Sequence, residues 1–289
     1  MKALFGILLV VLLTGIAWAD TGRSDMIIIA HRGNSSVFPE NTLEAYKSAI
    51  EMGADYIETD IWLSKDGVPV MLHDGNLKRT GGVDKNVADM TFDEIRRIEV
   101  NYAGKFGDKY TGILVPSVEE VLTLCRDTGA RVCLEMKTIA ACAPVKQLME
   151  KTGFREDMAI ILVWTNDNVR EAYKYFKKAP IYHLAPLGGY KNAEDKDAYF
   201  KEMRKAGLRG LDVNAGELFG MPTEEMNRYV FLAKKYGMPI VLWTVDDEAT
   251  MHRIFDTEVR GKAATARLSG ITTNVPSLGL DIRKQRTGE

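Results

Sequence analysis

The chain has 289 residues, with 38 Lys and Arg against 40 Asp and Glu, so its formal net charge is −2. A chain this close to neutrality has no basic excess, which argues against a nucleic-acid partner. Its length allows one large α/β barrel or two smaller domains.

The first nineteen residues are typical of a secretory signal peptide. Lys2 precedes an apolar run that ends in the A-x-A pattern Ala17–Ala19. The run is too short to cross a bilayer comfortably as a mature helix, and no later segment is apolar enough to span one. We therefore expect cleavage before Asp20 and export to the periplasm or the medium, with 20–289 as the mature domain. An uncleaved N-terminal anchor is the alternative.

The mature chain alternates strand-like runs with amphipathic stretches, which is typical of parallel strands joined by helices. The nine runs lie near 26–30, 55–61, 68–72, 131–136, 158–163, 180–184, 208–213, 238–243 and 270–273. Too few residues separate the second and third runs for a crossover helix, and Asp66-Gly67 predicts a tight reversal there. Simple counting then places Asp60 opposite His73. This extra strand would explain nine runs where a closed barrel has eight.

Several helix starts are signalled by capping residues. Ser117–Glu120 is a capping box that follows Pro116, and Pro222-Thr223 opens a later helix. In Pro39–Glu44 we expect Asn41 to cap a helix and Glu44 to reach back to it. The start of that helix would also offer a positive dipole end to an anion.

Two segments fit no regular element. Residues 75–112 are polar and glycine-rich, with a short helix expected at Phe92–Ile98, and they follow a strand end where barrels place substrate loops. Residues 257–268 are expected to form a solvated loop. The three cysteines, Cys125, Cys133 and Cys142, lie in apolar patterns without a metal-ligand spacing, so we expect buried free thiols.

Acidic residues close two strands, as Glu58 and Asp60 on one and Glu135 on another. Glu58 and Asp60 are two residues apart, so they face the same side of a sheet. Three inward carboxylates at one barrel end would repel one another unless a cation lay between them. Oxygen ligands favour Mg²⁺ or Ca²⁺, so we expect one such ion, the alternative being a surface pair of carboxylates.

Other strand ends carry residues suited to phosphate chemistry. His31 and His73 each follow an apolar strand and suit general acid–base catalysis, although either could merely cap its strand. Arg32 and Lys137 would bind a phosphate ester, the alternative being salt bridges to the carboxylates. Trp243 could pack against a glycerol or sugar, or in the core. His183 and His252 lack polar neighbours in sequence and are given structural roles.

Taken together, these motifs resemble the glycerophosphodiester phosphodiesterase family. The family elements HRG, PENT, E-x-D, DG, HD, E-x-K and WTV occur in family order as His31–Gly33, Pro39–Thr42, Glu58–Asp60, Asp66-Gly67, His73-Asp74, Glu135–Lys137 and Trp243–Val245. The resemblance implies a somewhat irregular TIM (β/α)8 barrel with a tight connection between the second and third strands and a long insertion after the third.

The resemblance further implies a metal-dependent enzyme that hydrolyses deacylated phospholipids to an alcohol and sn-glycerol 3-phosphate. Carried over by motif, His31 and His73 are the acid–base pair, and Glu58, Asp60 and Glu135 hold Mg²⁺ or Ca²⁺. Arg32 and Lys137 would bind phosphate. In this family the substrate's glycerol hydroxyl is thought to attack first, giving a cyclic phosphodiester that water then opens.

Three departures from the family pattern concern substrate fit. Thr273-Asn274 stands where Thr-Asp is usual, which removes a carboxylate near the barrel mouth, and Trp164-Thr165 replaces Ser-Phe. The third departure is the insertion 257–268. Two alternatives remain, namely a phosphodiesterase of the lysophospholipase D type and a binding protein for glycerophosphodiesters without turnover. The sequence leaves the headgroup, the choice between Mg²⁺ and Ca²⁺ and the oligomeric state open.

Overall fold

The structure is a computed structural model, and it describes residues 26–184, 186–260 and 265–288. The signal peptide expected over residues 1–19 lies outside these residues. None of the described helices is long and apolar enough to cross a membrane.

Eight parallel strands close into a barrel, which confirms the expected TIM fold. Their hydrogen-bonded order is β1-β11-β8-β7-β6-β5-β4-β2, and β1 pairs with β2 to complete the circle. The strands are β1 (Ile27–Ala30), β2 (Tyr56–Leu63), β4 (Val132–Met136), β5 (Ala159–Val163), β6 (Ile181–Leu184), β7 (Leu208–Asn214), β8 (Ile240–Trp243) and β11 (Gly270–Thr273). All of them were expected from the sequence.

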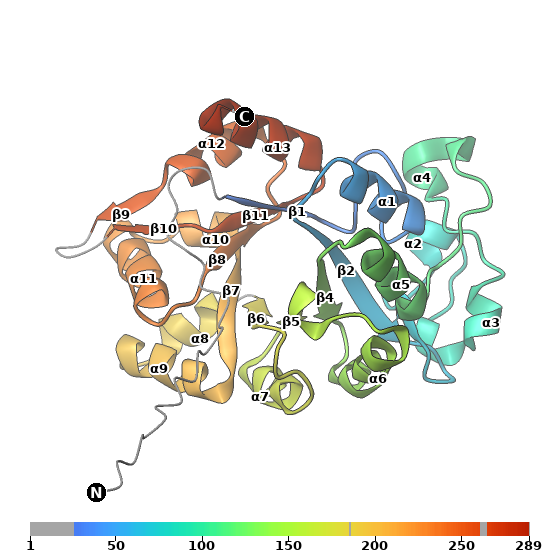
Figure 1. Cartoon of the computed structure of the whole chain (residues 1–289), viewed down its shortest axis with the longest axis horizontal. Coiled ribbons are helices and arrows are strands. Elements are labelled where there is room, and N and C mark those ends of the chain that lie inside the picture. Colours follow the sequence, from blue (N-terminus) through green and yellow to red (C-terminus); the bar gives the residue numbers. More distant parts are fainter. Residues whose placement is uncertain (1–25, 185, 261–264, 289) are drawn as a thin grey trace, which may run out of the picture.

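Helices surround the barrel as an outer ring (Figure 1). The longer ones are α1 (Leu43–Glu51), α5 (Val118–Thr128), α6 (Cys142–Thr152), α7 (Asn166–Tyr175), α9 (Lys196–Ala206), α11 (Thr223–Lys235), α12 (Glu248–Asp256) and α13 (Pro276–Thr287). Two short helices, α8 (Leu187–Asn192) and α10 (Ala215–Phe219), follow β6 and β7. The Ser117–Glu120 capping box is present at the start of α5 as expected.

The expected capping of α1 by Asn41 and Glu44 is wrong. The N-cap residue is Thr42, whose hydroxyl accepts a hydrogen bond from the backbone N–H of Ala45. Asn41 has a φ of 57° and turns its side chain toward β2 instead. Because the helix begins one residue later, Glu44 is not in the position from which a capping box closes.

Strand β3 (Pro69–Met71) runs antiparallel to β2, as expected, but its register differs by one residue from the expected one. Ile61 lies opposite Met71, and the backbone N–H of Leu72 donates to the carbonyl of Asp60, so Leu72 rather than His73 faces Asp60. The cause is the turn. Residues 65–67 lie between the bonded residues Ser64 and Val68, where counting assumed a two-residue turn.

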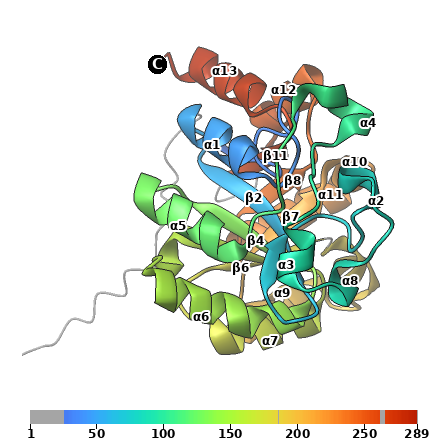
Figure 2. The ribbon, with the colours of Figure 1, turned by 90° about the vertical axis from the view of Figure 1, so that its right-hand side faces the viewer.

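The segment after β3 forms short helices on one side of the barrel (Figure 2). These are the α-helices α2 (Lys78–Gly81), α3 (Phe92–Ile95) and α4 (Ala103–Phe106) and the 3-10 helices η1 (Val87–Asp89) and η2 (Gly107–Lys109). The segment shares a small hydrophobic cluster with β3, made of Val70, Leu72, Leu77, Val87, Met90, Ile95, Val100, Ile113 and Val115. This cluster packs the insertion against the β2–β3 hairpin and holds it beside the barrel mouth.

Residues 257–268 are not a solvated loop. Their described parts form an antiparallel pair, β9 (Glu258–Arg260) and β10 (Thr265–Arg267). Val259, Ala266 and Leu268 are buried in the main core. The three cysteines are buried and free, as expected.

Candidate active site

The candidate site lies at the carboxyl ends of the barrel strands. A cavity of about 90 Å³, the inner cavity, is bordered by seven of the eight expected site residues, namely His31, Arg32, Glu58, His73, Glu135, Lys137 and Trp243. The eighth, Asp60, is buried next to them and pairs across the sheet with Glu135. The barrel thus brings together residues that are more than two hundred positions apart.

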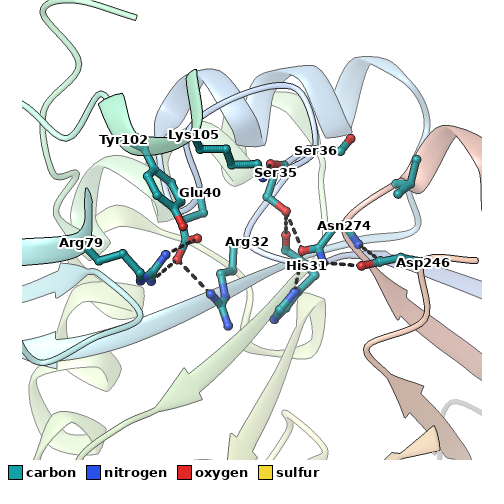
Figure 3. A pocket seen from close by; sticks show the side chains of 11 residues that line it. His31, Arg32, Ser35, Ser36, Glu40, Arg79, Tyr102, Lys105, Asp246 and Asn274 are labelled. Atoms are coloured by element: carbon teal, nitrogen blue, oxygen red, sulfur yellow. Dashed lines mark hydrogen bonds and ion pairs between the residues drawn. The ribbon is translucent and has the colours of Figure 1, made fainter. Parts of the chain in front are cut away.

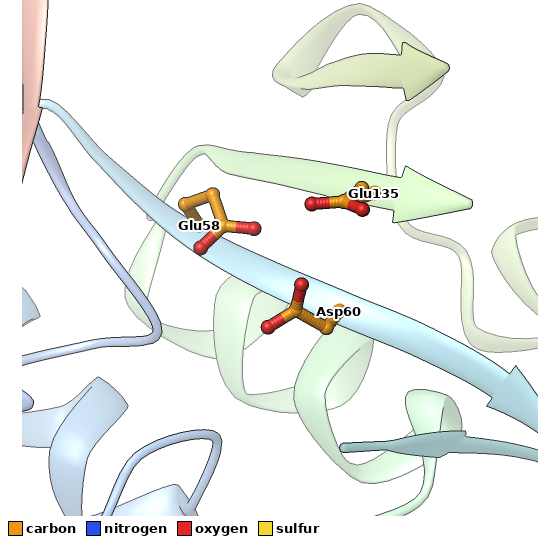
Figure 4. Close-up of side chains that lie close together, drawn as sticks. All are labelled: Glu58, Asp60 and Glu135. Carbon is orange, nitrogen blue, oxygen red and sulfur yellow. The ribbon is translucent and has the colours of Figure 1, made fainter. Parts of the chain in front are cut away.

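Three carboxylates form the centre of the site (Figure 4). One oxygen each of Glu58, Asp60 and Glu135 lies within 4.8 Å of the others, and all three side chains are buried. Glu58 and Asp60 are two residues apart on β2 and therefore lie on the same face of the sheet. Strand β4 places Glu135 directly beside Asp60. The expected grouping of these carboxylates is therefore present.

Burial and mutual repulsion set the charge of these groups. Burial raises the pKa of Glu58 well above its ordinary value, with Asp60 and Glu135 adding to the effect. Burial also raises the pKa of Glu135 to about 7. Burial alone would raise the pKa of Asp60 too, but Lys137 and Arg32 hold it below its ordinary value. Two of the three carboxyls therefore resist ionisation unless further positive charge is supplied.

The donor set fits a hard divalent cation. All three groups offer oxygen, and Glu58 Oε1 is buried without a hydrogen-bond partner among the described residues. An unsatisfied buried carboxylate oxygen is rare, because leaving it unpaired is costly. A cation among the three carboxylates would both satisfy this oxygen and relieve the repulsion.

The two cations beside the carboxylates form ion pairs. Lys137 Nζ lies 2.9 Å from Asp60 Oδ1 and 2.6 Å from Glu135 Oε1. Arg32 Nε lies 3.3 Å from Asp60 Oδ2, and the backbone N–H of Arg32 donates to Glu58 Oε2 at 3.0 Å. Both cations thus lie beside the carboxylates in the salt bridges that the sequence analysis gave as the alternative to phosphate binding.

Asn41 is a site residue that the sequence analysis misread as a cap. Its amide Nδ2 donates to Asp60 Oδ2 at 2.8 Å, and its Oδ1 accepts from the Tyr46 hydroxyl at 2.7 Å. It therefore fixes the orientation of the Asp60 carboxylate. The signal available in the sequence was an Asn between the His31 loop and a helix, which is equally typical of a cap.

His31 is oriented by a hydrogen-bonded chain at the barrel rim (Figure 3). Asn274 Nδ2 donates to Asp246 Oδ2 at 2.7 Å, which leaves Asn274 Oδ1 as the acceptor facing His31 Nδ1 at 2.8 Å. His31 Nδ1 therefore carries the proton, and the unprotonated Nε2 faces the inner cavity, 3.9 Å from Glu58 Oε2. Burial, aided by Arg32, lowers the pKa of His31 to about 4.

The sequence predicts a missing carboxylate at position 274. Asp246 supplies a carboxylate nearby, because it bonds to Asn274, which in turn bonds to His31. Asp246 also accepts hydrogen bonds from the backbone N–H of Asn274 and from the hydroxyl of Thr273. Sequence reasoning missed Asp246, although it follows the Trp243–Val245 motif directly.

His73 is more exposed than His31 and has a carboxylate partner. Its Nδ1 lies 2.7 Å from Asp74 Oδ1, and Asp74 Oδ2 accepts from Arg79 Nε at 2.7 Å. The indole N–H of Trp62 donates to the backbone carbonyl of His73 at 3.0 Å. Burial lowers the pKa of His73, while Asp60 opposes the shift. Because Asp74 occupies Nδ1, the Nε2 of His73 is the ring nitrogen that points away from Asp74.

A second cavity, the outer cavity, of about 520 Å³ meets the inner one at His31 and Arg32, which border both. Its other walls are Ser35, Ser36, Glu40, Arg79, Tyr102, Lys105, Asp246, Asn274 and Val275 (Figure 3). Sequence reasoning expected a substrate loop at 75–112 but did not single out Arg79, Tyr102 or Lys105.

Glu40 joins the outer cavity to the site. It accepts hydrogen bonds from Arg32 at 2.9 Å and from two nitrogens of Arg79 at 2.8 and 2.7 Å. Burial alone would raise the pKa of Glu40, but the two arginines hold it below its ordinary value. A largely buried, doubly paired carboxylate of this kind fixes both guanidinium groups.

Two tryptophans cover the inner cavity on the other side. The rings of Trp164 and Trp243 are 6.1 Å apart and nearly perpendicular. Trp164 Nε1 donates to Glu135 Oε1 at 2.7 Å, and Trp243 Nε1 donates to the backbone carbonyl of Asp212 at 3.2 Å. Trp164, which departs from the family pattern, therefore contacts a carboxylate of the central group.

The arrangement can perform acid–base chemistry on a phosphate ester. Two imidazoles with anchored Nδ1 atoms flank a group of carboxylates suited to a cation, and two further cations lie beside it. Each of the expected residues is at the mouth of the same barrel.

Known proteins are similar to this chain in sequence and in fold. The profile of the glycerophosphoryl diester phosphodiesterase family matches residues 31–263. A glycerophosphodiester phosphodiesterase of Caldanaerobacter subterraneus is 30% identical over 244 residues, covering 81% of this chain and 92% of the relative. One of Bacillus subtilis is 28% identical over 277 residues, covering 90% and 87%.

Solved structures agree in fold. A glycerophosphodiester phosphodiesterase from Thermotoga maritima superposes with a TM-score of 0.69 at 24% identity, covering 89% of this chain and 98% of that one. A phosphodiesterase from Oleispira antarctica, solved with the product sn-glycerol-3-phosphate, gives a TM-score of 0.72 at 19% identity, covering 88% and 95%.

Proposed function

The chain belongs to the glycerophosphoryl diester phosphodiesterase family, and we propose that it is an exported, metal-dependent enzyme that hydrolyses glycerophosphodiesters to an alcohol and sn-glycerol 3-phosphate. The observation that supports this most strongly is the group of Glu58, Asp60 and Glu135 between His31 and His73. Export is supported by the signal-peptide pattern of residues 1–19.

The cation would be held by Glu58, Asp60 and Glu135, and either Mg²⁺ or Ca²⁺ suits these oxygen ligands. When bound, such a cation withdraws negative charge from phosphate oxygens. Arg32 and Lys137 would share their present carboxylate contacts with the phosphate, and their fixed charges would stabilise the charge that grows on its non-bridging oxygens.

The two histidines would move protons in both halves of the reaction. His31, with Nδ1–H bound to Asn274, would take the proton of the substrate's glycerol hydroxyl on Nε2 while that oxygen bonds to phosphorus. The bond from phosphorus to the alcohol oxygen breaks, and His73, held by Asp74, gives that oxygen a proton. The cyclic phosphodiester then opens as water adds to phosphorus, with the two histidines in exchanged roles.

The outer cavity supports a water-soluble substrate over a lysophospholipid. Its walls carry Arg79, Lys105, Glu40 and hydroxyl groups, and the ring of Tyr102 lies under the guanidinium of Arg79 at 5.2 Å. Such a lining suits a polar alcohol better than an acyl chain.

The purified protein is expected to release glycerol 3-phosphate from glycerophosphocholine or glycerophosphoethanolamine, and a chelator is expected to stop the release. H31A and H73A should each abolish turnover while the circular dichroism spectrum stays unchanged. Full activity after chelation would contradict the metal role, and tight substrate binding without product would establish a binding protein instead.

Two further measurements address the remaining parts of the proposal. Higher activity on lysophosphatidylcholine than on glycerophosphocholine would favour the lysophospholipase D alternative. N-terminal sequencing of the exported protein should begin at Asp20, whereas retention of Met1 on the membrane fraction would indicate an uncleaved anchor.

A further inference from the structure

Two buried polar side chains border the inner cavity and take no part in the proposed reaction. Asp212 on β7 is 3% exposed and Thr272 on β11 is 2% exposed. Neither Asp212 Oδ1 nor Thr272 Oγ1 has a hydrogen-bond partner among the described residues. Buried polar atoms are almost always paired in folded proteins, so two unpaired oxygens at one cavity call for a ligand that pairs with them.

The surroundings of these oxygens indicate which kind of ligand fits. The same wall of the cavity includes Leu162, Leu184 and Trp243, so it is largely apolar. Asp212 is not one of the carboxylates close enough together to hold an ion, and it forms no ion pair among the described residues. A phosphate or a cation is therefore not the expected occupant of this wall.

Both side chains suit an alcohol. Burial raises the pKa of Asp212 well above its ordinary value, with Glu135 adding to the effect, which favours the protonated form, and a protonated carboxyl has one donor and one acceptor. A threonine hydroxyl likewise donates and accepts. An alcohol hydroxyl has the same pair of functions, and the carbon chain that carries it can lie against an indole ring.

The two cavities also determine which end of the substrate lies in which cavity. They meet at His31 and Arg32, and His73 and Lys137 border the inner cavity close by, so the phosphate must lie on the inner side of this junction for acid–base chemistry. A phosphodiester centred there extends one arm into the inner cavity of about 90 Å³ and the other into the outer cavity of about 520 Å³. The narrow inner cavity suits a three-carbon arm, and the wide outer one suits an alcohol of variable size.

We propose that Asp212 and Thr272 bind the free hydroxyl groups of the glycerol moiety in the inner cavity, leaving the outer cavity for the departing alcohol. This inference rests on the proposed function, because it takes a glycerophosphodiester as the substrate. It makes Asp212 and Thr272 the residues that distinguish a glycerol phosphate from a phosphate ester without hydroxyls.

The test compares two product-like ligands that differ only in their hydroxyl groups. Binding of sn-glycerol 3-phosphate and of propyl phosphate to the whole protein is measured by calorimetry with Mg²⁺ or Ca²⁺ present. The wild type should bind glycerol 3-phosphate more tightly than propyl phosphate. D212L and T272V, which remove the donor and the acceptor, should each reduce this preference about tenfold, as expected for the loss of one hydrogen bond to a buried group, with propyl phosphate binding unchanged.

T80V is the matched control, because Thr80 Oγ1 is also buried without a partner among the described residues but lies outside both cavities. It should leave the preference unchanged. Thermal melting shows which variants are folded. If D212L does not fold, T272V alone tests the inference. An unchanged preference in folded T272V and D212L overturns the inference, as does loss of the preference in S36A, whose side chain lines the outer cavity. Failure of wild-type protein to bind either ligand contradicts the proposed function itself.

Discussion

Among the described residues, three that are not glycine have a left-handed backbone, and all three border the site. They are Arg32 with φ 55°, Asn41 with φ 57° and Tyr102 with φ 50°. Such conformations cost on the order of 1–3 kcal/mol each in side-chain-bearing residues. The contacts explain why they persist, since Arg32 turns its N–H to Glu58 and Asn41 turns its amide to Asp60. Tyr102 bonds its N–H to the Thr80 carbonyl and presents its ring to Arg79.

Replacement of Asn41 should separate its strain from its hydrogen bonds. N41A removes the contacts to Asp60 and Tyr46 while keeping an unfavourable φ, so we expect a loss of about 2–4 kcal/mol in the free energy of unfolding. N41G removes the same contacts but accepts the backbone, so its loss should be smaller by about 1 kcal/mol. Urea denaturation measures both, and equal losses would show that the backbone conformation carries no strain.

His183 should make the stability of the protein depend on pH. It is buried, and burial lowers its pKa to about 4. In the unfolded chain its pKa is about 6.5, so below that pH the unfolded state binds a proton that the folded state refuses. The contribution is fully present above pH 6.5 and is lost as pH falls toward 4, at up to about 1.4 kcal/mol per pH unit.

H183Q removes this titration and is the variant to compare. Between pH 7 and pH 5 the wild type should lose about 2 kcal/mol more of its free energy of unfolding than H183Q does. The measurement is urea unfolding at each pH. Parallel pH profiles for the two proteins would show that His183 is protonated in the folded state.

At the scale of elements, Arg79 connects the segment of α2–α4 to two catalytic side chains at the barrel mouth. Arg79 of α2 donates to Glu40, which precedes α1 in the chain, and to Asp74, which is paired with His73. It therefore links the orientation of both Arg32 and His73 to the position of the insertion. This is an element that positions catalytic groups without being part of the barrel.

R79M should therefore affect activity more than stability. We expect kcat to fall by about 10- to 100-fold, because Asp74 and Glu40 lose the donor that orients them. Melting should change little, because the side chain is partly exposed. K78M is the matched control on the same helix, where Lys78 forms only an exposed pair with Asp84. Similar kinetics for the two variants would contradict this role.

The strands were predictable because their apolar runs are bounded by clear turn signals, and the site residues followed from the ends of those runs. The register of β3 was not, since Asp66-Gly67 is compatible with a turn of two or three residues. Asn41 was misread because a cap and a buried hydrogen-bond donor look alike in sequence. The burial of Val259 and Ala266 depends on what β9 and β10 pack against, which only the fold reveals.

At the scale of the whole molecule, the barrel gathers charges that no single segment could hold. β2 and β4 contribute three carboxylates to one buried point, and the loop after β1 and the end of β4 contribute Arg32 and Lys137. The partners of His31 come from the opposite end of the chain, at Asn274 and Asp246. The site therefore exists only in the closed barrel, and its stability and that of the fold are linked.

Cation binding should accordingly stabilise the whole protein. A ligand that binds only the folded state adds about 2.7 kcal/mol at a concentration one hundred times its Kd, which corresponds to a rise in Tm of about 5 °C for a chain of this size. Calorimetry with Mg²⁺, with Ca²⁺ and with chelator measures this rise without any substrate. E58Q removes a carboxylate whose pKa is raised by burial and by its neighbours, so its chelated form should melt at or above the wild-type temperature while its response to the cation is lost. A wild-type Tm that is the same under all three conditions would mean that Lys137 and Arg32 alone neutralise the carboxylates, and the metal role would have to be abandoned.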